Sequence, residues 1–296
     1  MRHAVLGVGG IGGLIGGGLA RAGADVVLLL RPETLEGHPG RLRIESVVFG
    51  DFEAEVTLAP ELRGDVDVLW VTVKAPQLEA ALELAPVERV GHATVVPLMN
   101  GVDHVSLLRA RYESVLAGSI GVESERVEPG FIRHRRGTRV ALAPGPSRDA
   151  IAQELRSAAF DVGHPPDEPT LLWEKLAFIA PLALTTTAAG KTAGAVRTNP
   201  VWSSRLLHCC DETLAVGRAV GATPDAPSVR GLFDAVGADM RTSMQKDFDA
   251  GRQLELDAIA GPVVRSGLQH GIATPATEEL VSLVEARLAE RAISRG

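Results

Sequence analysis

The sequence predicts an α/β protein in which a doubly wound parallel sheet is followed by an all-helical domain. Three observations predict this fold class. An apolar segment at the N-terminus leads directly into a glycine-rich turn. Strand-like and helix-like segments then alternate, a pattern typical of parallel sheets. Beyond residue 169, apolar residues recur at helical spacing. The length of 296 residues also fits two domains, at about 150 residues per domain.

The first half of the chain reads as one strand after another, separated by helical segments. The first strand continues into a turn and an apolar, small-residue helix at Gly13–Ala22, which together make the start of a Rossmann βαβ unit. The predicted strands are Arg2–Leu6, Asp25–Leu30, Val66–Val73, Val95–Met99 and Ser114–Val122, and Gln77–Leu84 is one of the helices between them.

The pattern changes within Asp161–Pro169, where prolines and a glycine interrupt the chain. We therefore predict domains of residues 1–166 and 167–296. The last helix has a clear start, because Thr274 can cap it and Pro275 suits the first helical position. The other predicted helices are Leu171–Leu184, Val201–Val220, Ser228–Arg241 and Glu255–Gln269. The basic stretch Arg133–Arg139, which surrounds Gly137, is predicted to be a solvated hairpin.

Composition excludes several classes of protein. The formal charge is −7 and the sequence pI is near 5.7, which argues against a nucleic-acid partner. The adjacent Cys209 and Cys210 lack metal-ligand spacing and suit no ordinary disulfide, so we predict reduced thiols, no metal and a cytoplasmic protein. Ala4–Ala20 is uncharged and has the outline of a signal peptide, but its many glycines favour a strand and a turn over a membrane segment.

The glycine-rich turn has the spacing G-x-G-x-x-G after a strand and before a helix, which is the dinucleotide-binding pattern. Its candidate cofactor-binding residues are Gly7, Gly9, Gly10, Ile11 and Gly12. Gly7 permits the tight turn, Gly9 lets the backbone approach a pyrophosphate, and Gly12 allows close packing of the helix. The competing interpretation is a glycine-rich packing turn without a ligand.

Arg31 stands nineteen positions after Gly12, at the end of the second predicted strand. An NAD site usually has an acidic residue there, whereas arginine suits the 2′-phosphate of NADP through charge-assisted bonds. The sequence therefore predicts NADP. Glu33, two residues further on, leaves NAD open as the alternative.

Seven segments of the chain carry a family resemblance when taken together. They are GVGGIG with Arg31, VTVKAPQ at Val71–Gln77, PLMNGV at Pro97–Val102, WEKL at Trp173–Leu176, TSMQKD at Thr242–Asp247, QLELDAIAG at Gln253–Gly261 and HGIATP at His270–Pro275. In this order, and over nearly the whole chain, the sequence resembles the ketopantoate reductases (2-dehydropantoate 2-reductases).

The resemblance implies reduction of a 2-keto acid to a 2-hydroxy acid by NADPH. It also implies a cleft between the NADP-binding domain and the helical substrate domain, and a possible homodimer through the helical domain. Lys175 would be the general acid, and Glu255 would orient the substrate or the nicotinamide ribose. Ser243 would bind the substrate carboxylate, and Asn100 would contact the nicotinamide ribose or the substrate. Lys74 and Gln77 would lie along the cofactor.

Each of these residues also has an ordinary structural interpretation: a surface lysine, a turn asparagine, a capping serine or a solvated acid. One departure bears on the substrate. Where the family has two asparagines, four and eight positions after the lysine, this chain has Ile179 and Ala183. These positions share a helix face with Lys175. The alternatives are therefore a relative that acts on a bulkier or more apolar 2-keto or 2-hydroxy acid, and a nucleotide-binding regulator that has lost turnover.

Overall fold

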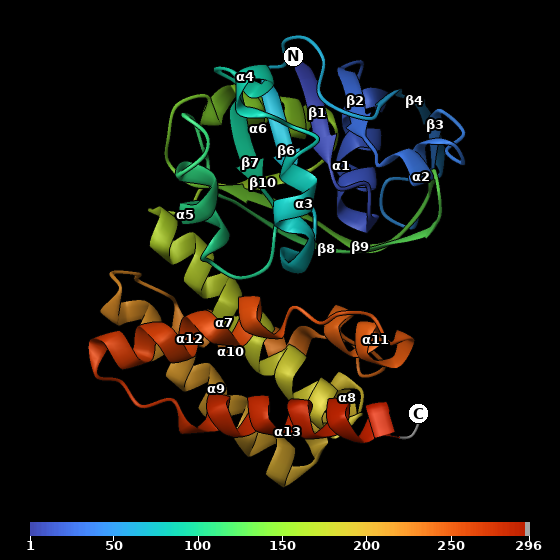
Figure 1. Ribbon diagram of the computed structural model, residues 1–296. Coiled ribbons are helices and arrows are strands. Elements are labelled where there is room, and N and C mark those ends of the chain that lie inside the picture. The colour runs from blue at the N-terminus through green and yellow to red at the C-terminus, as the bar shows by residue number, and fades with distance from the viewer. Residues whose placement is uncertain (294–296) are drawn as a thin grey trace. The chain divides into compact units, whose positions relative to one another are not determined.

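The computed structural model describes residues 1–293, which form two compact units (Figure 1). The first unit comprises Met1–Met99 and His104–Glu168. The second begins at Pro169 and also includes the short segment Asn100–Asp103. Four residues in the middle of the chain are therefore part of the later, helical unit.

A five-stranded parallel sheet forms the centre of the first unit, with the order β5-β2-β1-β6-β7. Almost every residue of the three middle strands is buried, as expected when both faces of a parallel sheet are covered. The strand order reverses between β1 and β6, and ligands of such sheets bind at the carboxyl ends of the strands beside this reversal. The bounds are β1 Arg2–Leu6, β2 Asp25–Leu29, β5 Thr57–Ala59, β6 Val68–Val71 and β7 Thr94–Pro97.

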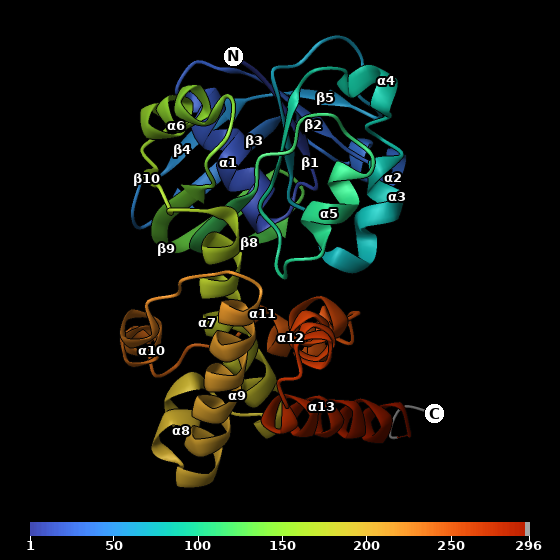
Figure 2. The ribbon, with the colours of Figure 1, turned by 90° about the vertical axis from the view of Figure 1, so that its left-hand side faces the viewer.

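Different helices cover the two faces of this sheet (Figure 2). The helix α1, Gly10–Arg21, packs through Leu14, Ile15 and Leu19 on one face. On the other face lie α3 (Leu78–Leu82), α4 (Val87–Val90) and α5 (His104–Arg109). The parallel, doubly wound Rossmann sheet predicted from the sequence is confirmed. The unit also contains α2 (Pro32–Leu35), the short helix η1 (Ala75–Gln77) and α6 (Arg148–Ser157).

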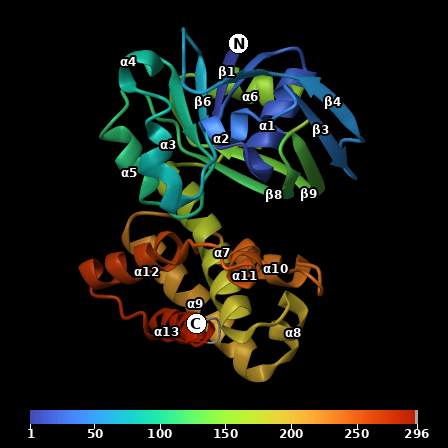
Figure 3. The same ribbon diagram turned by 45° about the vertical axis from the view of Figure 1, so that its right-hand side comes forward.

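A second sheet covers the outer side of α1, and the sequence analysis predicted only part of one of its strands (Figure 3). The helix lies close to it because glycines face it: a Cβ on Gly13 would come within 2.4 Å of Ile132 Cδ1, and one on Gly17 within 2.2 Å of Ile44 Cδ1. The small residues of α1 therefore let it lie between two sheets. The strands are β3 Arg41–Ser46, β4 Phe52–Glu55, β8 Gly118–Glu128, β9 Phe131–Leu142 and β10 Asp161–Gly163.

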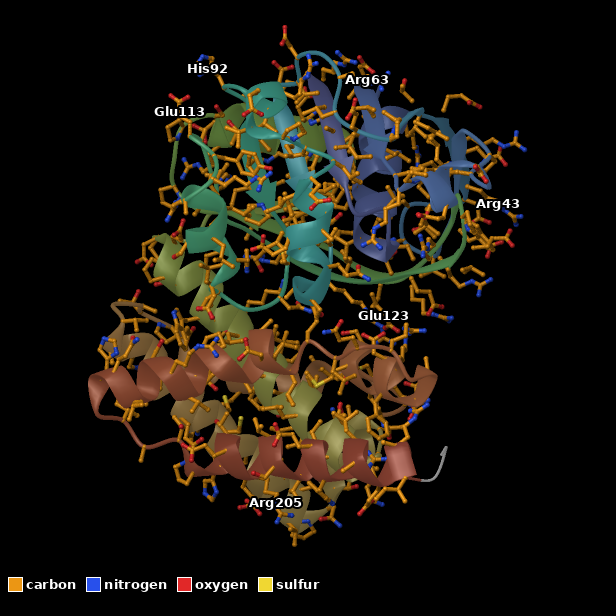
Figure 4. All side chains as sticks on the ribbon, in the orientation of Figure 1. Arg43, Arg63, His92, Glu113, Glu123 and Arg205 are labelled. Carbon is orange, nitrogen blue, oxygen red and sulfur yellow. The ribbon has the colours of Figure 1, made fainter. Side chains whose placement is uncertain are left out.

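The basic stretch belongs to an antiparallel hairpin, as predicted, but the turn of this hairpin is not at Gly137. Gly137 lies inside β9, with a φ of +85°, beside an irregularity in the pairing of β8 with β9. The turn of the hairpin lies earlier, at Gly130. The arginines of β9 form ion pairs with acids of the neighbouring strands, so their charges are neutralised locally: Arg133 with Glu45, Arg135 with Glu125, Arg136 with Glu123 and Arg139 with Asp161. Figure 4 labels Glu123 and also Arg43, which projects from β3 at the surface.

One long helix, α7 (Glu168–Ala189), is the centre of the helical unit (Figures 2 and 3). Its residues belong to all three apolar clusters of that unit, so it is buried on every side. The predicted start of the last helix at Pro275 is confirmed. The helix predicted to reach Arg241 ends earlier, because the backbone becomes extended at Val236. The other helices are α8 Ala193–Thr198, α9 Pro200–Ala219, α10 Ala226–Ala235, α11 Ser243–Ala250, α12 Leu256–His270 and α13 Pro275–Ile293.

None of the helices within residues 1–293 combines the length and the apolar character that crossing a membrane requires.

Candidate functional site

The glycine turn of the first unit connects β1 to α1 and has an opening at one position. Gly7 has a φ of +99°, and a Cβ there would lie 2.5 Å from Val73 Cγ1, so only glycine fits. A Cβ on Gly9 would meet no atom within 4 Å. The backbone of Gly9, just before the N-terminus of α1, is therefore open to a ligand, which fits a pyrophosphate on the helix N-terminus.

Gly12 fixes the position of α1 against this turn. A Cβ on Gly12 would lie 2.3 Å from the Gly7 carbonyl oxygen and 2.4 Å from Thr72 Oγ1. The Thr72 hydroxyl donates to that same Gly7 carbonyl at 2.7 Å, which connects the end of β6 to the turn. The three glycines thus have the distinct steric roles that the sequence pattern predicts.

The strand β8 lies directly over the turn, which sequence reasoning missed. The Ser124 hydroxyl donates to the Gly10 carbonyl at 2.9 Å, and Arg126 Nη1 donates to the Val8 carbonyl at 3.3 Å. These partners are more than a hundred residues apart in the chain, so no local sequence pattern connects them. Ile11, also predicted to bind cofactor, lies half-buried in the first turn of α1.

The other predicted cofactor residues of this unit follow strands of the same sheet. Arg31 follows β2, is exposed and precedes Pro32, the first residue of α2. Lys74 is half-buried and precedes η1, which ends at the exposed Gln77. Because β1, β2 and β6 are parallel, their carboxyl ends share one edge of the sheet. The structure therefore places the glycine turn, Arg31, Lys74 and Gln77 along that edge.

In the second unit, two predicted residues that are 155 positions apart meet. Asn100 Nδ2 donates to Glu255 Oε2 at 3.1 Å. The contact is possible because Gly101 has a φ of +86° and its Cα lies against α12: a Cβ there would be 2.2 Å from the Ala258 carbonyl oxygen. The asparagine-glycine pair, which could be an ordinary turn, thus connects this segment to the start of α12.

Lys175, on α7, is the third member of this cluster. Burial lowers the pKa of Lys175 to about 8, although the charge of Glu255 acts in the opposite direction and raises it. Glu255 is itself buried, and it directly precedes α12, where the positive end of the helix dipole favours its negative charge. A lysine with a pKa near neutrality can give up or accept a proton easily. Lys175, Glu255 and Asn100 therefore form a candidate acid–base cluster.

The remaining predicted residues of this unit lie in different environments. Ser243 is exposed at the first position of α11, and the residue that caps this helix is Thr242, whose hydroxyl accepts from Gln245 N. The alternative that Ser243 caps the helix is therefore wrong. Ala183 is buried and Ile179 is half-buried, and both pack in the apolar cluster that also contains Leu176.

The two cysteines take no part in a site. Both are buried on α9 as free thiols, and burial raises the pKa of Cys209 to about 12 and that of Cys210 to about 11. Both thiols therefore stay protonated at neutral pH. Within residues 1–293, no group of three His, Cys, Asp or Glu side chains is arranged to hold a metal ion.

Two family models match the chain. "Ketopantoate reductase PanE/ApbA" matches residues 3–147, and "Ketopantoate reductase PanE/ApbA C terminal" matches residues 170–288. The 2-dehydropantoate 2-reductase of Mycobacterium tuberculosis is 31% identical over 96% of this chain and 96% of its own length. That of Caulobacter vibrioides is 30% identical over 96% of this chain and 98% of its own.

Solved structures agree with the sequence comparisons. A PanE/ApbA family ketopantoate reductase from Ralstonia eutropha superimposes with a TM-score of 0.89, at 26% identity, over 99% of this chain and 100% of that one. A 2-dehydropantoate 2-reductase from Geobacter metallireducens gives a TM-score of 0.86 at 27% identity, over 97% of this chain and 99% of that one. Both parts of the chain and its whole length are thus accounted for, and the chain belongs to the ketopantoate reductase family.

Proposed function

We propose that the protein is an NADPH-dependent reductase that converts a 2-keto acid to a 2-hydroxy acid, as the names of its relatives suggest. The observation that carries this proposal is the cluster of Lys175, Glu255 and Asn100. A lysine with a lowered pKa beside a buried carboxylate suits protonation of a carbonyl oxygen. This constellation has no use in a regulator that only binds nucleotide, so it disfavours that alternative.

The residues present fit an NADP cofactor. The open backbone at Gly9 and the N-terminus of α1 suit the pyrophosphate. The exposed guanidinium of Arg31 suits the 2′-phosphate. The residues that would hold the cofactor are Gly7, Gly9, Gly10, Ile11, Gly12, Arg31, Lys74, Gln77, Asn100 and Glu255. When bound, the reduced nicotinamide supplies the hydride.

The chain's own residues supply the proton and orient the substrate. As the keto carbon is reduced, negative charge develops on its oxygen, and the Lys175 ammonium stabilises this charge and then donates its proton. Glu255 favours the charged form of Lys175 and, through its bond from Asn100, fixes the amide of Asn100. The Ser243 hydroxyl, exposed at the start of α11, would donate to the substrate carboxylate.

The roles of the two parts of the chain follow from this assignment. Residues 1–166 would bind NADP, and residues 167–296 would bind the substrate and form a homodimer. The dimer and a cytoplasmic location remain proposals that rest on the family and on the composition of the chain.

A second candidate is a reductase for a bulkier or more apolar 2-keto acid than ketopantoate. Ile179 and Ala183 lie about one and two helical turns beyond Lys175 on α7, in an apolar cluster with Leu176. Neither side chain can form a hydrogen bond with a substrate hydroxyl. A hydroxyl buried against them costs about 1–3 kcal/mol, whereas a methylene gains about 0.8 kcal/mol. This observation favours substrates such as 2-ketoisovalerate or phenylpyruvate.

The proposal is tested by following oxidation of NADPH, and of NADH in parallel, with ketopantoate, 2-ketoisovalerate and phenylpyruvate. We expect turnover of at least one keto acid, with a higher kcat/KM for NADPH. Binding of NADPH without turnover of any keto acid would favour the regulator instead. Equal kcat/KM for the two cofactors would contradict the assignment of Arg31 to a 2′-phosphate.

A further inference from the structure

Arg126 lies at the glycine turn but has no part in the function proposed above. It belongs to β8, and its side chain is exposed apart from the 3.3 Å bond from Nη1 to the Val8 carbonyl. A guanidinium has five N–H donors, and this long bond uses one of them. Ser124, two residues earlier, holds the strand on the same turn. Arg126 thus places a positive charge beside the turn that would receive the cofactor.

His38 provides a second, independent indication of a ligand. It follows α2, the short helix that starts immediately after Arg31, and only 9% of the surface of this residue is exposed. Its Nδ1 accepts from the Gly40 N–H at 3.3 Å, so in the neutral ring the proton is on Nε2. Nε2 is buried and has no hydrogen-bond partner among the described residues. Buried donors of this kind are rare in native proteins.

The segments that carry Arg126 and His38 pack against each other: a Cβ on Gly130, four residues after Arg126, would lie 2.6 Å from Cγ of Pro39, the residue next to His38. Burial is the larger cause that lowers the pKa of His38, and the positive charge of Arg126 lowers it further. The pair offers only N–H donors. Arg126 contacts the glycine turn through Val8, and His38 lies in the segment after β2, where the 2′ substituent of the adenosine ribose is recognised.

We propose that Arg126 and His38, together with Arg31, form the binding site for the 2′-phosphate of NADPH. Arg126 would turn from the Val8 carbonyl toward the phosphate, and the Nε2–H of His38 would donate to a second phosphate oxygen. A phosphate with a charge near −2 supplies an acceptor for the Nε2–H of His38, and further acceptors and a counter-charge for the Arg126 guanidinium. The inference rests on the proposed function only in requiring that a dinucleotide binds at the glycine turn.

The first test compares the binding of NADPH and NADH to the full-length protein and to Arg126→Gln by isothermal titration calorimetry. The matched control is Arg135→Gln, which removes the same charge from β9, where Arg135 forms an exposed ion pair with Glu125. We expect Arg126→Gln to raise the Kd of NADPH by about ten- to a hundred-fold, the range for charged hydrogen bonds. The Kd of NADH, and both values for the control, should stay within about twofold of the unsubstituted protein.

A second variant, His38→Phe, separates a ligand role from a structural one. Phenylalanine keeps a ring and removes the unpaired donor, but it also removes the Nδ1 acceptor of the Gly40 N–H, so the melting temperature should change little. The Kd of NADPH should nevertheless rise several-fold, and that of NADH should not change. Unchanged NADPH binding in both variants would overturn the inference, and so would equal losses for NADPH and NADH, which would indicate the pyrophosphate instead.

These outcomes are distinct from failure of the proposed function. A protein that binds NADPH through Arg126 but reduces no keto acid would leave this inference intact and contradict the reductase. A protein that reduces a keto acid, but whose NADPH affinity is unchanged in Arg126→Gln and His38→Phe, would support the reductase and contradict this inference.

Discussion

Lys175 is subject to two opposing electrostatic influences, and their balance makes its function depend on pH. Burial favours the neutral amine and lowers the pKa to about 8, and the charge of Glu255 limits that shift. At neutral pH most Lys175 side chains therefore still carry the proton that reduction requires. Above about pH 8 that proton is lost, because the lowered pKa is the one that applies in the folded protein.

The first prediction follows from this titration. The kcat/KM for keto-acid reduction should fall about tenfold for each pH unit above about 8. Oxidation of the 2-hydroxy acid, which needs neutral Lys175 as a base, should rise up to about pH 8 and level off above it. Initial rates from pH 6 to 10 in both directions measure this. A reduction rate that is flat up to pH 10 would remove Lys175 as the acid.

The same balance predicts the effect of removing Glu255. In Glu255→Gln the charge that raises the pKa of Lys175 is absent, so the fall in kcat/KM should begin at a lower pH than in the unsubstituted protein. Asp257→Asn is the control, because it removes a carboxylate that lies exposed two residues away and pairs with Arg265. In the control, kcat/KM should still begin to fall near pH 8. If the fall also begins near pH 8 in Glu255→Gln, this carboxylate does not act on Lys175.

At the scale of single elements, the glycine turn has one position with room for a side chain and one position without it. A Cβ on Gly9 meets no atom within 4 Å, and the backbone there is extended, a conformation that alanine adopts. A Cβ on Gly12 would lie 2.3 Å from a backbone oxygen, which cannot move without moving the turn. One glycine is thus required by the ligand and the other by the fold.

Alanine substitutions at these two glycines should therefore give opposite results. Gly9→Ala should keep the melting temperature and weaken NADPH binding by at least about tenfold, since its methyl group occupies the place of the pyrophosphate. Gly12→Ala should destabilise the protein by about 1–3 kcal/mol, the usual cost of overpacking. Thermal denaturation and NADPH titration of both variants measure this. Full NADPH affinity in Gly9→Ala would contradict a pyrophosphate at the turn.

The face of α7 that carries Lys175 makes a prediction about the substrate. Ile179→Asn with Ala183→Asn adds two amides where the chain now has apolar side chains, so kcat/KM for ketopantoate should rise relative to that for 2-ketoisovalerate by about five- to a hundred-fold. Because Ala183 is buried, the melting temperature of the double variant is measured alongside. A hundred-fold preference for ketopantoate in the unsubstituted protein would show that other groups bind its hydroxyl.

Across the whole molecule, the sequence predicted the elements whose signals are local. Four strands of the parallel sheet are apolar runs, and the last helix has its own start signal, whereas the short and more exposed β5 was not predicted. The second sheet was missed because strands such as β3 and β4 are short and only half apolar. These two strands pair with each other, and β3 joins the rest of the sheet only by pairing with β9, far along the chain. The glycines of α1 indicated that another element packs closely on this helix, but they did not indicate that this element is a second sheet.

The candidate site shows the same division. Single residues such as Lys175 and Arg31 could be identified from motifs, because each motif is contiguous. Asn100 and Glu255 were also identified from motifs, but their contact could not be predicted, because Asn100 reaches Glu255 only through the close approach of Gly101 to α12. Likewise Arg126 reaches the glycine turn only through the second sheet. Contacts between residues so far apart in the chain leave no pattern in a single sequence.

The central claim is that Lys175 protonates the carbonyl oxygen of a 2-keto acid as NADPH reduces it. The most direct measurement is single-turnover oxidation of bound NADPH with the best keto acid, in the unsubstituted protein and in Lys175→Ala, with NADPH affinity measured on both. The account predicts a loss of about a hundred- to ten-thousand-fold in the rate, with NADPH affinity nearly unchanged. An Lys175→Ala protein that reduces the keto acid at the full rate would contradict it.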